Sequence, residues 1–111
     1  MLGEFVSFHR KTADGKPAGG RTIAAGLQID WQNGPLVVDG ALQQPNGAFV
    51  ETVIAAARDR LRHYQDETPF ACAENALAMQ HLDDALRVLR SRTERRAAAG
   101  TLGTHEKDAA E

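Results

Sequence analysis

The feature that most constrains the fold is a change in the spacing of apolar residues near residue 46. Before that point Leu27, Ile29 and Trp31 alternate with polar residues, the period of a strand with one buried face. After it the apolar residues recur at helical spacing, at Val50, Val53, Ile54, Ala57, Leu61 and Tyr64. A strand region followed by a helical region predicts an α+β fold.

The strand region, residues 1–45, contains three stretches typical of short strands, namely 4–9, 21–31 and 36–42. The glycine- and proline-rich run KTADGKPAGG between the first two predicts a loop, and Asn33-Gly34-Pro35 predicts a turn. Asp39-Gly40 indicates a bulge or a second turn within the last stretch. Two or three short antiparallel strands are too few to be stable unless something packs on one face.

The helical region predicts two helices. Asn46 is the expected N-cap of the first helix, which QDETP at 65–69 interrupts. Thr68 is the expected cap of a second helix over about 69–98, with Pro69 in its first turn and Gly100 after its end. A short break between two long helices predicts an antiparallel hairpin. The apolar stripe of the second helix consists of Ala78, Leu82, Ala85, Leu86, Leu89 and Thr93.

Five arginines lie close together near the end of the second helix. On a helical wheel with Arg87 at zero, Arg92 and Arg96 fall at about 140° and 180°, against or inside the apolar stripe, and Arg95 falls at about 80°. Arg87 and Arg90 fall on the open side, where water or helical neighbours among Asp83, Asp84 and Glu94 would satisfy them.

The arginines at positions 92, 95 and 96 allow two interpretations. In the first, the apolar core has run out and the side chains complement the helix dipole and its last carbonyls. In the second, they form a clamp for phosphate or pyrophosphate, because each guanidinium holds two oxygens at once, and the glycine-rich segment that follows folds over the ligand.

Two further residues are candidates for ligand contacts. Asn75 falls at about 240° on the same wheel, inside the apolar stripe, and a buried amide needs hydrogen-bond partners. Those partners are either backbone groups of the strand region or of a second subunit, or the edge of a base or sugar. Phe70 is either a core residue or a ring that stacks on a purine.

Several classes of function lack their signatures. Thirteen Lys and Arg against fifteen Asp and Glu give a net charge of -2, so we expect no binding to duplex nucleic acid or to an anionic membrane. Cys72 is the only cysteine and the four histidines have no metal-site spacing, so we expect no metal and no cofactor. No GxSxG or P-loop motif occurs, which argues against an enzyme. The lack of an apolar leader or a stretch of about 18 apolar residues predicts a cytoplasmic protein.

Three segments carry a resemblance to a known family. WQNGP at 31–35, FACAENALAM at 70–79 and RTERRAAAGTLGTH at 92–105 resemble segments of the phage Thoeris anti-defence 1 family, which shares a helical hairpin with the phage anti-CBASS 2 proteins. The resemblance covers roughly residues 27–105. It implies a sponge in the cytoplasm of the infected bacterial host, which captures cyclic ADP-ribose isomers such as 1′′–3′ gcADPR without cleaving them.

The same resemblance implies an assembly. Family members bind the ligand in two equivalent pockets of a homodimer, and some form hexamers, as trimers of dimers, that bind cyclic di- or trinucleotides at separate sites. This sequence departs from the family pattern at Ala73, where the family has arginine, and at Gly100-Thr101-Leu102, where it has Gly-Val-Glu. These differences leave the choice of ligand open.

Together these inferences predict a single sponge domain over 1–105, with a small antiparallel sheet (about 1–45) packed on a helical hairpin (46–98) that dimerises through its helices. Residues 99–105 would close over the ligand and 106–111 would form a disordered tail. In the expected site, Phe70 stacks on the base, Asn75 bonds a base or ribose edge, and the arginines hold the phosphates. Thr104 and His105 close the pocket. The alternatives are a sponge for cyclic di- or trinucleotides, a helical dimerisation module without a ligand, and a hydrolase of the signal.

Overall fold

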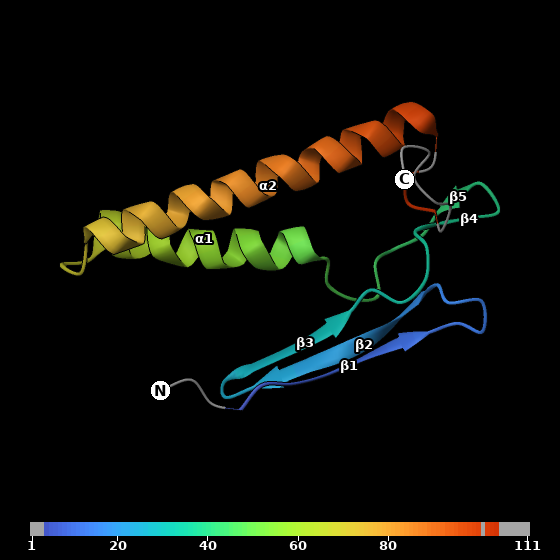
Figure 1. Cartoon of the computed structure of the whole chain (residues 1–111), viewed down its shortest axis with the longest axis horizontal. Helices are drawn as coiled ribbons and strands as arrows, with labels where there is room; N and C mark the ends of the chain where they lie inside the picture. The colour runs from blue at the N-terminus through green and yellow to red at the C-terminus, as the bar shows by residue number, and fades with distance from the viewer. Residues whose placement is uncertain (1–3, 101, 105–111) are drawn as a thin grey trace. The chain divides into compact units, whose positions relative to one another are not determined.

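A computed structural model describes residues 4–100 and 102–104 and has the predicted α+β composition (Figure 1). The chain divides into two units. The β unit contains the described residues up to Phe49 and those from Gly100 onward, and the helical unit is Val50–Ala99. His105 and the predicted tail over 106–111 lie outside the described residues. In the part of the chain that is described, no helix is long and apolar enough to cross a membrane.

The larger sheet of the β unit has three antiparallel strands in the order β1-β2-β3. They are β1 (Val6–Lys11), β2 (Pro17–Ala24) and β3 (Leu27–Trp31). The prediction of a loop over residues 11–20 is therefore wrong in its second half, where β2 begins. The prediction of a strand over 21–31 is also wrong in part, because a turn at Ala25-Gly26 divides it into two strands.

Gly20 explains why a glycine-rich stretch forms a strand here. A Cβ atom at this position would lie 2.3 Å from the carbonyl oxygen of Phe8 on β1, and its φ angle is +145°. The glycine is required for close approach of two strand backbones rather than for a loop. That requirement comes from a partner strand, so the local composition did not reveal it.

The face of the sheet that carries Leu27, Ile29 and Trp31 has its most buried point at Thr22, which is 3% exposed. The indole nitrogen of Trp31 donates to Thr22 Oγ1 at 2.8 Å, and Ser7 Oγ lies 2.7 Å from the same oxygen. Ile29 and Trp31 are half-buried, as the alternation predicts, but Leu27 is 44% exposed. The buried face is thus centred on a hydroxyl network at the middle strand.

A second, two-stranded sheet consists of β4 (Val37–Val38) and β5 (Ala41–Leu42). Asp39 and Gly40 connect them with φ angles of +52° and +78°. Two successive residues with positive φ are the signature of a type I′ turn, for which Asp-Gly is a preferred sequence. The second turn predicted at Asp39-Gly40 is confirmed.

Asn46 does not cap a helix. Its side-chain oxygen accepts a hydrogen bond from the backbone N–H of Asn33 at 2.8 Å, and its Nδ2 donates to the Asn33 carbonyl at 2.9 Å. These two bonds tie the Asn33-Gly34-Pro35 turn to the chain that leaves the β unit. Helix α1 (Val50–Glu67) begins four residues after Asn46, so the predicted start was too early.

Helix α2 (Ala73–Ala99) begins later than predicted because Thr68 closes α1 instead of opening α2. The Thr68 hydroxyl donates to the Tyr64 carbonyl at 2.8 Å and accepts from the Phe70 N–H at 3.1 Å. The N-cap of α2 is Cys72, whose sulfur accepts from the Asn75 N–H at 3.4 Å. A thiol is a weak acceptor and lies outside the usual set of capping residues, so the sequence did not indicate it.

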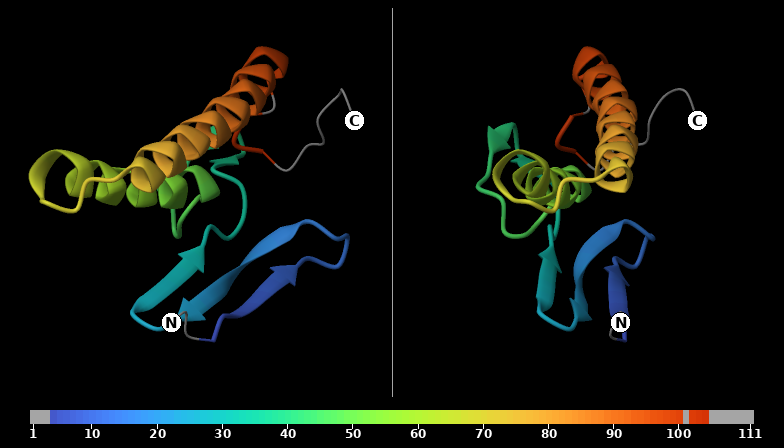
Figure 2. Two further views of the ribbon diagram at one scale, coloured as in Figure 1. Left: turned by 60° about the vertical axis from the view of Figure 1, so that its left-hand side comes forward. Right: turned by 90° about the vertical axis from the view of Figure 1, so that its left-hand side faces the viewer.

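The two helices form the predicted antiparallel hairpin, and α2 is the longer of the two (Figures 1 and 2). Arg58 of α1 bonds Asp83 of α2, and Gln65 bonds the Cys72 N–H. Because Val50 begins α1 eight residues before Arg58, its level on α2 is about eight residues after Asp83. The last two turns of α2 therefore extend beyond the N-terminus of α1.

The apolar core of the described residues is small, since no hydrophobic side chain in them is fully buried. Large apolar side chains remain exposed in both units. In the helical unit these include Val50, Leu77 and Val88, which are 52%, 54% and 64% exposed. A chain of this size buries little apolar surface by itself, so exposed apolar side chains are notable. A partner could bury them.

Candidate functional site

The predicted phosphate-binding arginines lie on the part of α2 that extends beyond α1. Arg96 is 5% exposed and is the only charged side chain that is buried among the described residues, whereas Arg92 and Arg95 are exposed. Arg96 is buried, as its place on the helical wheel predicts, but the same prediction is wrong for Arg92, which was placed against or inside the apolar stripe and is exposed. All three arginines have an interaction partner within the chain.

The other arginines of the cluster behave as the wheel predicts. Arg87 is 70% exposed at its side chain and forms an ion pair with Asp84 at 2.7 Å, one turn earlier on the same helix. Arg90 is exposed. Asp83, the alternative partner, is instead engaged by Arg58 of α1. The open side of α2 thus carries ordinary surface ion pairs and is not part of the candidate site.

Phe70 and Asn75 lie together at the beginning of α2. Asn75 is half-buried, and its Nδ2 donates a 3.2 Å hydrogen bond to the Phe70 carbonyl. Its partner is therefore the turn between the helices and not the strand region. The Phe70 ring is 71% exposed, so within a single chain it is not a core residue. An exposed aromatic ring whose backbone is held by a neighbouring amide is suited to stacking on a flat partner.

The two groups of candidates lie at opposite ends of one helix. Asn75 and Arg92 are both on α2, which has no interruption between them. At 1.5 Å per residue, the 17 steps between these positions correspond to about 25 Å. One chain therefore offers an aromatic and amide end and a separate basic end.

Thr104 belongs to the β unit, where the segment 102–104 runs beside strand β4. The Val37 N–H donates to the Gly103 carbonyl at 3.0 Å. Thr104 is half-buried and has an interaction partner of its own. The predicted ligand-closing segment is thus docked on a hairpin by its backbone. Its last predicted residue, His105, lies outside the described part of the chain.

A shallow groove of about 340 Å³ lies between the helices, and the sequence did not predict it. The residues that α2 contributes to the groove recur at intervals of three or four positions, so they lie on one face of the helix. This spacing is the one signal in the sequence that could have indicated the groove. The Arg58–Asp83 ion pair forms part of its rim. The lining residues are Arg58, Gln65, Ala76, Met79, Gln80 and Asp83.

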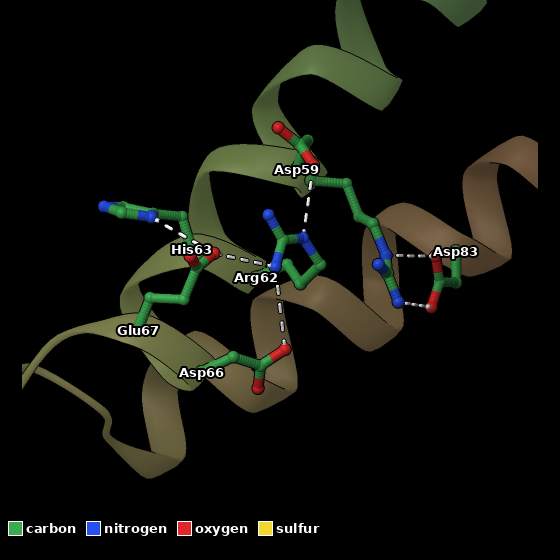
Figure 3. A network of polar contacts seen from close by, with 7 residues as sticks. Asp59, Arg62, His63, Asp66, Glu67 and Asp83 are labelled. Atoms are coloured by element: carbon green, nitrogen blue, oxygen red, sulfur yellow. Dashed lines mark hydrogen bonds and ion pairs between the residues drawn. The ribbon is translucent and has the colours of Figure 1, made fainter.

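A polar network on the last turns of α1 is centred on Arg62 (Figure 3). Its guanidinium contacts Asp59 at 3.2 Å, Glu67 at 3.0 Å and Asp66 at 3.8 Å. The hydrogen bonds that Arg62 donates to Asp59 and to Glu67 raise the pKa of the guanidinium. The guanidinium in turn lowers the pKa of Glu67, with a smaller contribution from His63. Carboxylates at a helix C-terminus oppose the helix dipole, and α1 has no basic residue in its last turn. The ion pairs with Arg62 therefore offset the unfavourable interaction between these carboxylates and the dipole of α1.

Comparison with known proteins gives two findings. Residues 24–94 match the model of a protein family described as Acb2/Tad1, hairpin domain. In addition, the chain is 40% identical over 79 residues to a protein named Thoeris anti-defense 1 from Bacillus phage SBSphiJ7. The aligned region is 71% of this chain and 52% of that protein, so the chain spans about half the length of this relative. The family match contains Phe70, Asn75 and Arg92.

Proposed function

Since this chain belongs to the Acb2/Tad1 hairpin family, we propose that it acts in phage anti-defence as a sponge. It binds a cyclic ADP-ribose isomer, such as 1′′–3′ gcADPR, and withholds it from Thoeris effectors without cleaving it. The signal is made in the cytoplasm of the infected bacterium, and this is where the protein acts.

The observation that carries this proposal is the separation of about 25 Å between Asn75 and Arg92 along α2. A cyclic nucleotide with one pyrophosphate is much shorter than this, so Asn75 and Arg92 of one copy cannot both contact it. In an antiparallel pair of copies, the aromatic end of each α2 meets the basic end of the other. Two copies then form two equivalent pockets, each with an aromatic ring, an amide and a group of arginines.

The chemistry of the two ends fits the parts of such a ligand. The arginines at 92, 95 and 96 bind the pyrophosphate, because a planar guanidinium matches two phosphate oxygens. The exposed Phe70 ring stacks on the adenine base. Asn75 keeps the ring in place through its bond to the Phe70 carbonyl and faces a base or ribose edge. Thr104 and His105 close the pocket.

Apolar surface on the helices supports the dimer. Leu77 and Val88 of α2 and Val50 of α1 are more than half exposed in the single chain. Burying such side chains against a second copy is favourable by about 25 cal/mol per Å² of apolar area. The helices are therefore the dimerisation surface, and larger assemblies would be trimers of these dimers.

Ala73, the exposed first residue of α2, lacks the guanidinium of the family pattern, which removes one possible anion contact. The choice of ligand is therefore open at that end, and a cyclic di- or trinucleotide is the alternative ligand.

Calorimetry with 1′′–3′ gcADPR, and separately with cyclic di- and trinucleotides, tests the proposal. The protein should bind one class tightly, and at 100 times the dissociation constant the ligand should stabilise the fold by about 2.7 kcal/mol. Heating the complex should release the ligand chemically unchanged. A melting temperature that none of the nucleotides alters would indicate a dimerisation module without a ligand, and recovery of a cleaved product would indicate a hydrolase.

A further inference from the structure

The β4–β5 hairpin has an outward backbone donor that its own ladder does not use. The Gln43 N–H donates to the Leu36 carbonyl at 2.6 Å, so these two residues form a hydrogen-bonded pair. Val37 lies opposite Leu42, one position closer to the turn. Hydrogen-bonded and non-hydrogen-bonded pairs alternate in an antiparallel ladder, so the Val37 N–H points away from β5.

This outward donor is the one that binds the segment after α2. The Val37 N–H donates to the Gly103 carbonyl at 3.0 Å, which gives β4 a second backbone neighbour besides β5. Leu102, the apolar residue of the segment, is 44% exposed. The segment is therefore held by its backbone and by the close fit of Gly103 rather than by burial of an apolar side chain.

Gly103 is the residue that makes this approach feasible. Its φ angle is +79°, a conformation that residues with a Cβ rarely adopt. A Cβ atom there would lie 3.1 Å from Val37 Cγ2 and 3.6 Å from Leu36 Cβ. The positive φ angle therefore selects glycine, and a Cβ atom would also press on the Val37 side chain, whereas its distance from Leu36 would be an ordinary van der Waals contact.

From these contacts we propose that the β4–β5 hairpin is a positioning element that presets Thr104 for contact with the bound nucleotide. Val37 and Gly103 are the positioning residues, and they act on the ligand through Thr104. The inference rests on the proposed sponge function. Fixing a contact residue before binding reduces the ordering cost of association, so the hairpin contributes to affinity without touching the ligand.

Two variants break the link at different atoms. Val37→Pro removes the outward N–H, and Gly103→Ala places a Cβ atom 3.1 Å from Val37 Cγ2 at a residue with a φ of +79°. Val37→Thr keeps the N–H and a similar shape and serves as the conservative control. Gly15→Ala is the matched glycine control, because Gly15 has a φ of +85° but nothing within 4 Å of the added atom.

The readouts separate positioning from folding. In calorimetry with 1′′–3′ gcADPR, Val37→Pro and Gly103→Ala should each raise Kd by about tenfold or more, while Val37→Thr and Gly15→Ala stay near wild type. Thr104→Ala should weaken binding in the wild-type background. It should add little to the loss caused by Gly103→Ala, because both changes remove the same contact of Thr104 with the nucleotide. Hydrogen exchange at the Val37 amide should be slow in the wild type and fast in Gly103→Ala, with or without ligand.

Either of two binding results would overturn the inference alone: wild-type affinity in Gly103→Ala and Val37→Pro, or the full Thr104→Ala loss in the Gly103→Ala background. Fast exchange of the Val37 amide in the wild type would do the same. A wild-type protein that binds no nucleotide would overturn the proposed function, and the positioning role with it.

Discussion

The side-chain amide of Asn75 donates a hydrogen bond to the backbone carbonyl of Phe70, and the two heavy atoms are 3.2 Å apart. This bond holds the turn between the helices at Phe70, which is 71% exposed. An exposed ring on an unrestrained turn would have to be ordered when a ligand binds. In the function that we propose, the amide would therefore prepare a stacking surface at the beginning of α2.

Replacement of Asn75 tests that role. Asn75→Asp keeps the size and an oxygen but loses the N–H that reaches the Phe70 carbonyl, so both Asn75→Asp and Asn75→Ala should raise Kd for 1′′–3′ gcADPR by about tenfold or more. Calorimetry measures the change, with Gln80→Ala on the same helix as the control. If Asn75→Ala weakens binding equally in wild type and in Phe70→Ala, the two residues act independently and the positioning role is wrong.

The arginines on the extended part of α2 should contribute most to affinity. Arg92→Ala or Arg96→Ala should cost about 2–5 kcal/mol of binding free energy if the guanidinium meets phosphate in a closed pocket. Arg87→Ala is the matched control, because Arg87 is 70% exposed and pairs with Asp84.

Arg96 is buried, so its replacement also tests folding. Melting curves of each variant separate the two effects, and the exposed Arg92 gives a second measurement that does not depend on a buried side chain. A loss of less than about tenfold for Arg92→Ala would exclude that side chain from the pocket.

Mixed dimers distinguish a pocket built by two copies from one built by a single chain. One variant carries Phe70→Ala and Asn75→Ala, and the other carries Arg92→Ala and Arg96→Ala. Each alone should fail to bind. In a mixed dimer made by co-expression, one pocket receives both damaged ends and the other receives both intact ends, so about half of the sites should bind with wild-type affinity. A purified mixed dimer with no binding would contradict the arrangement.

The sequence predicts the class of each half of this fold because the periods of apolar residues are local. The change of period near residue 46 indicated strands before it and an antiparallel helical hairpin after it, and both are present. The errors come from residues whose partners are distant in the sequence. Gly20 suggested a loop but lies against the Phe8 carbonyl, and Asn46 suggested a helix cap but binds the backbone of Asn33.

The candidate site follows the same rule. The wheel predicted an inner position for both Arg92 and Arg96, and only Arg96 is buried, because burial also depends on what packs beside that part of the helix. The need of Asn75 for a hydrogen-bond partner was also predicted, but its partner, the Phe70 carbonyl, depends on where α2 begins. The contact of Gly103 with Val37 joins positions that are far apart in the sequence, and no local pattern reports it.

The ion pair between Arg58 and Asp83 should stabilise the hairpin modestly. Its two bonds, Nε to Oδ1 at 3.0 Å and Nη2 to Oδ2 at 3.3 Å, join α1 to α2, but the side chains are 35% and 51% exposed. Because water screens such a pair, Asp83→Asn should lower the free energy of unfolding by about 0.5–1 kcal/mol, and less in high salt. Thermal melting of Asp83→Asn beside Asp84→Asn, which affects only a pair within α2, measures the difference. Equal effects would show that the link between the helices adds nothing.

Acid should weaken the network at the end of α1 through Glu67. Arg62, and to a smaller extent His63, lowers the pKa of this carboxyl below its usual value of 4.5 in the folded chain. A carboxyl with a depressed pKa stabilises the fold above its unfolded pKa, and that contribution is lost as the pH falls through the folded pKa. The melting temperature of wild type should therefore exceed that of Glu67→Gln at pH 7, and the difference should shrink below about pH 4. Because the group is exposed, added salt should reduce the gap at pH 7 as well. A difference that stays constant or grows on acidification would mean that Glu67 gains nothing from the guanidinium of Arg62.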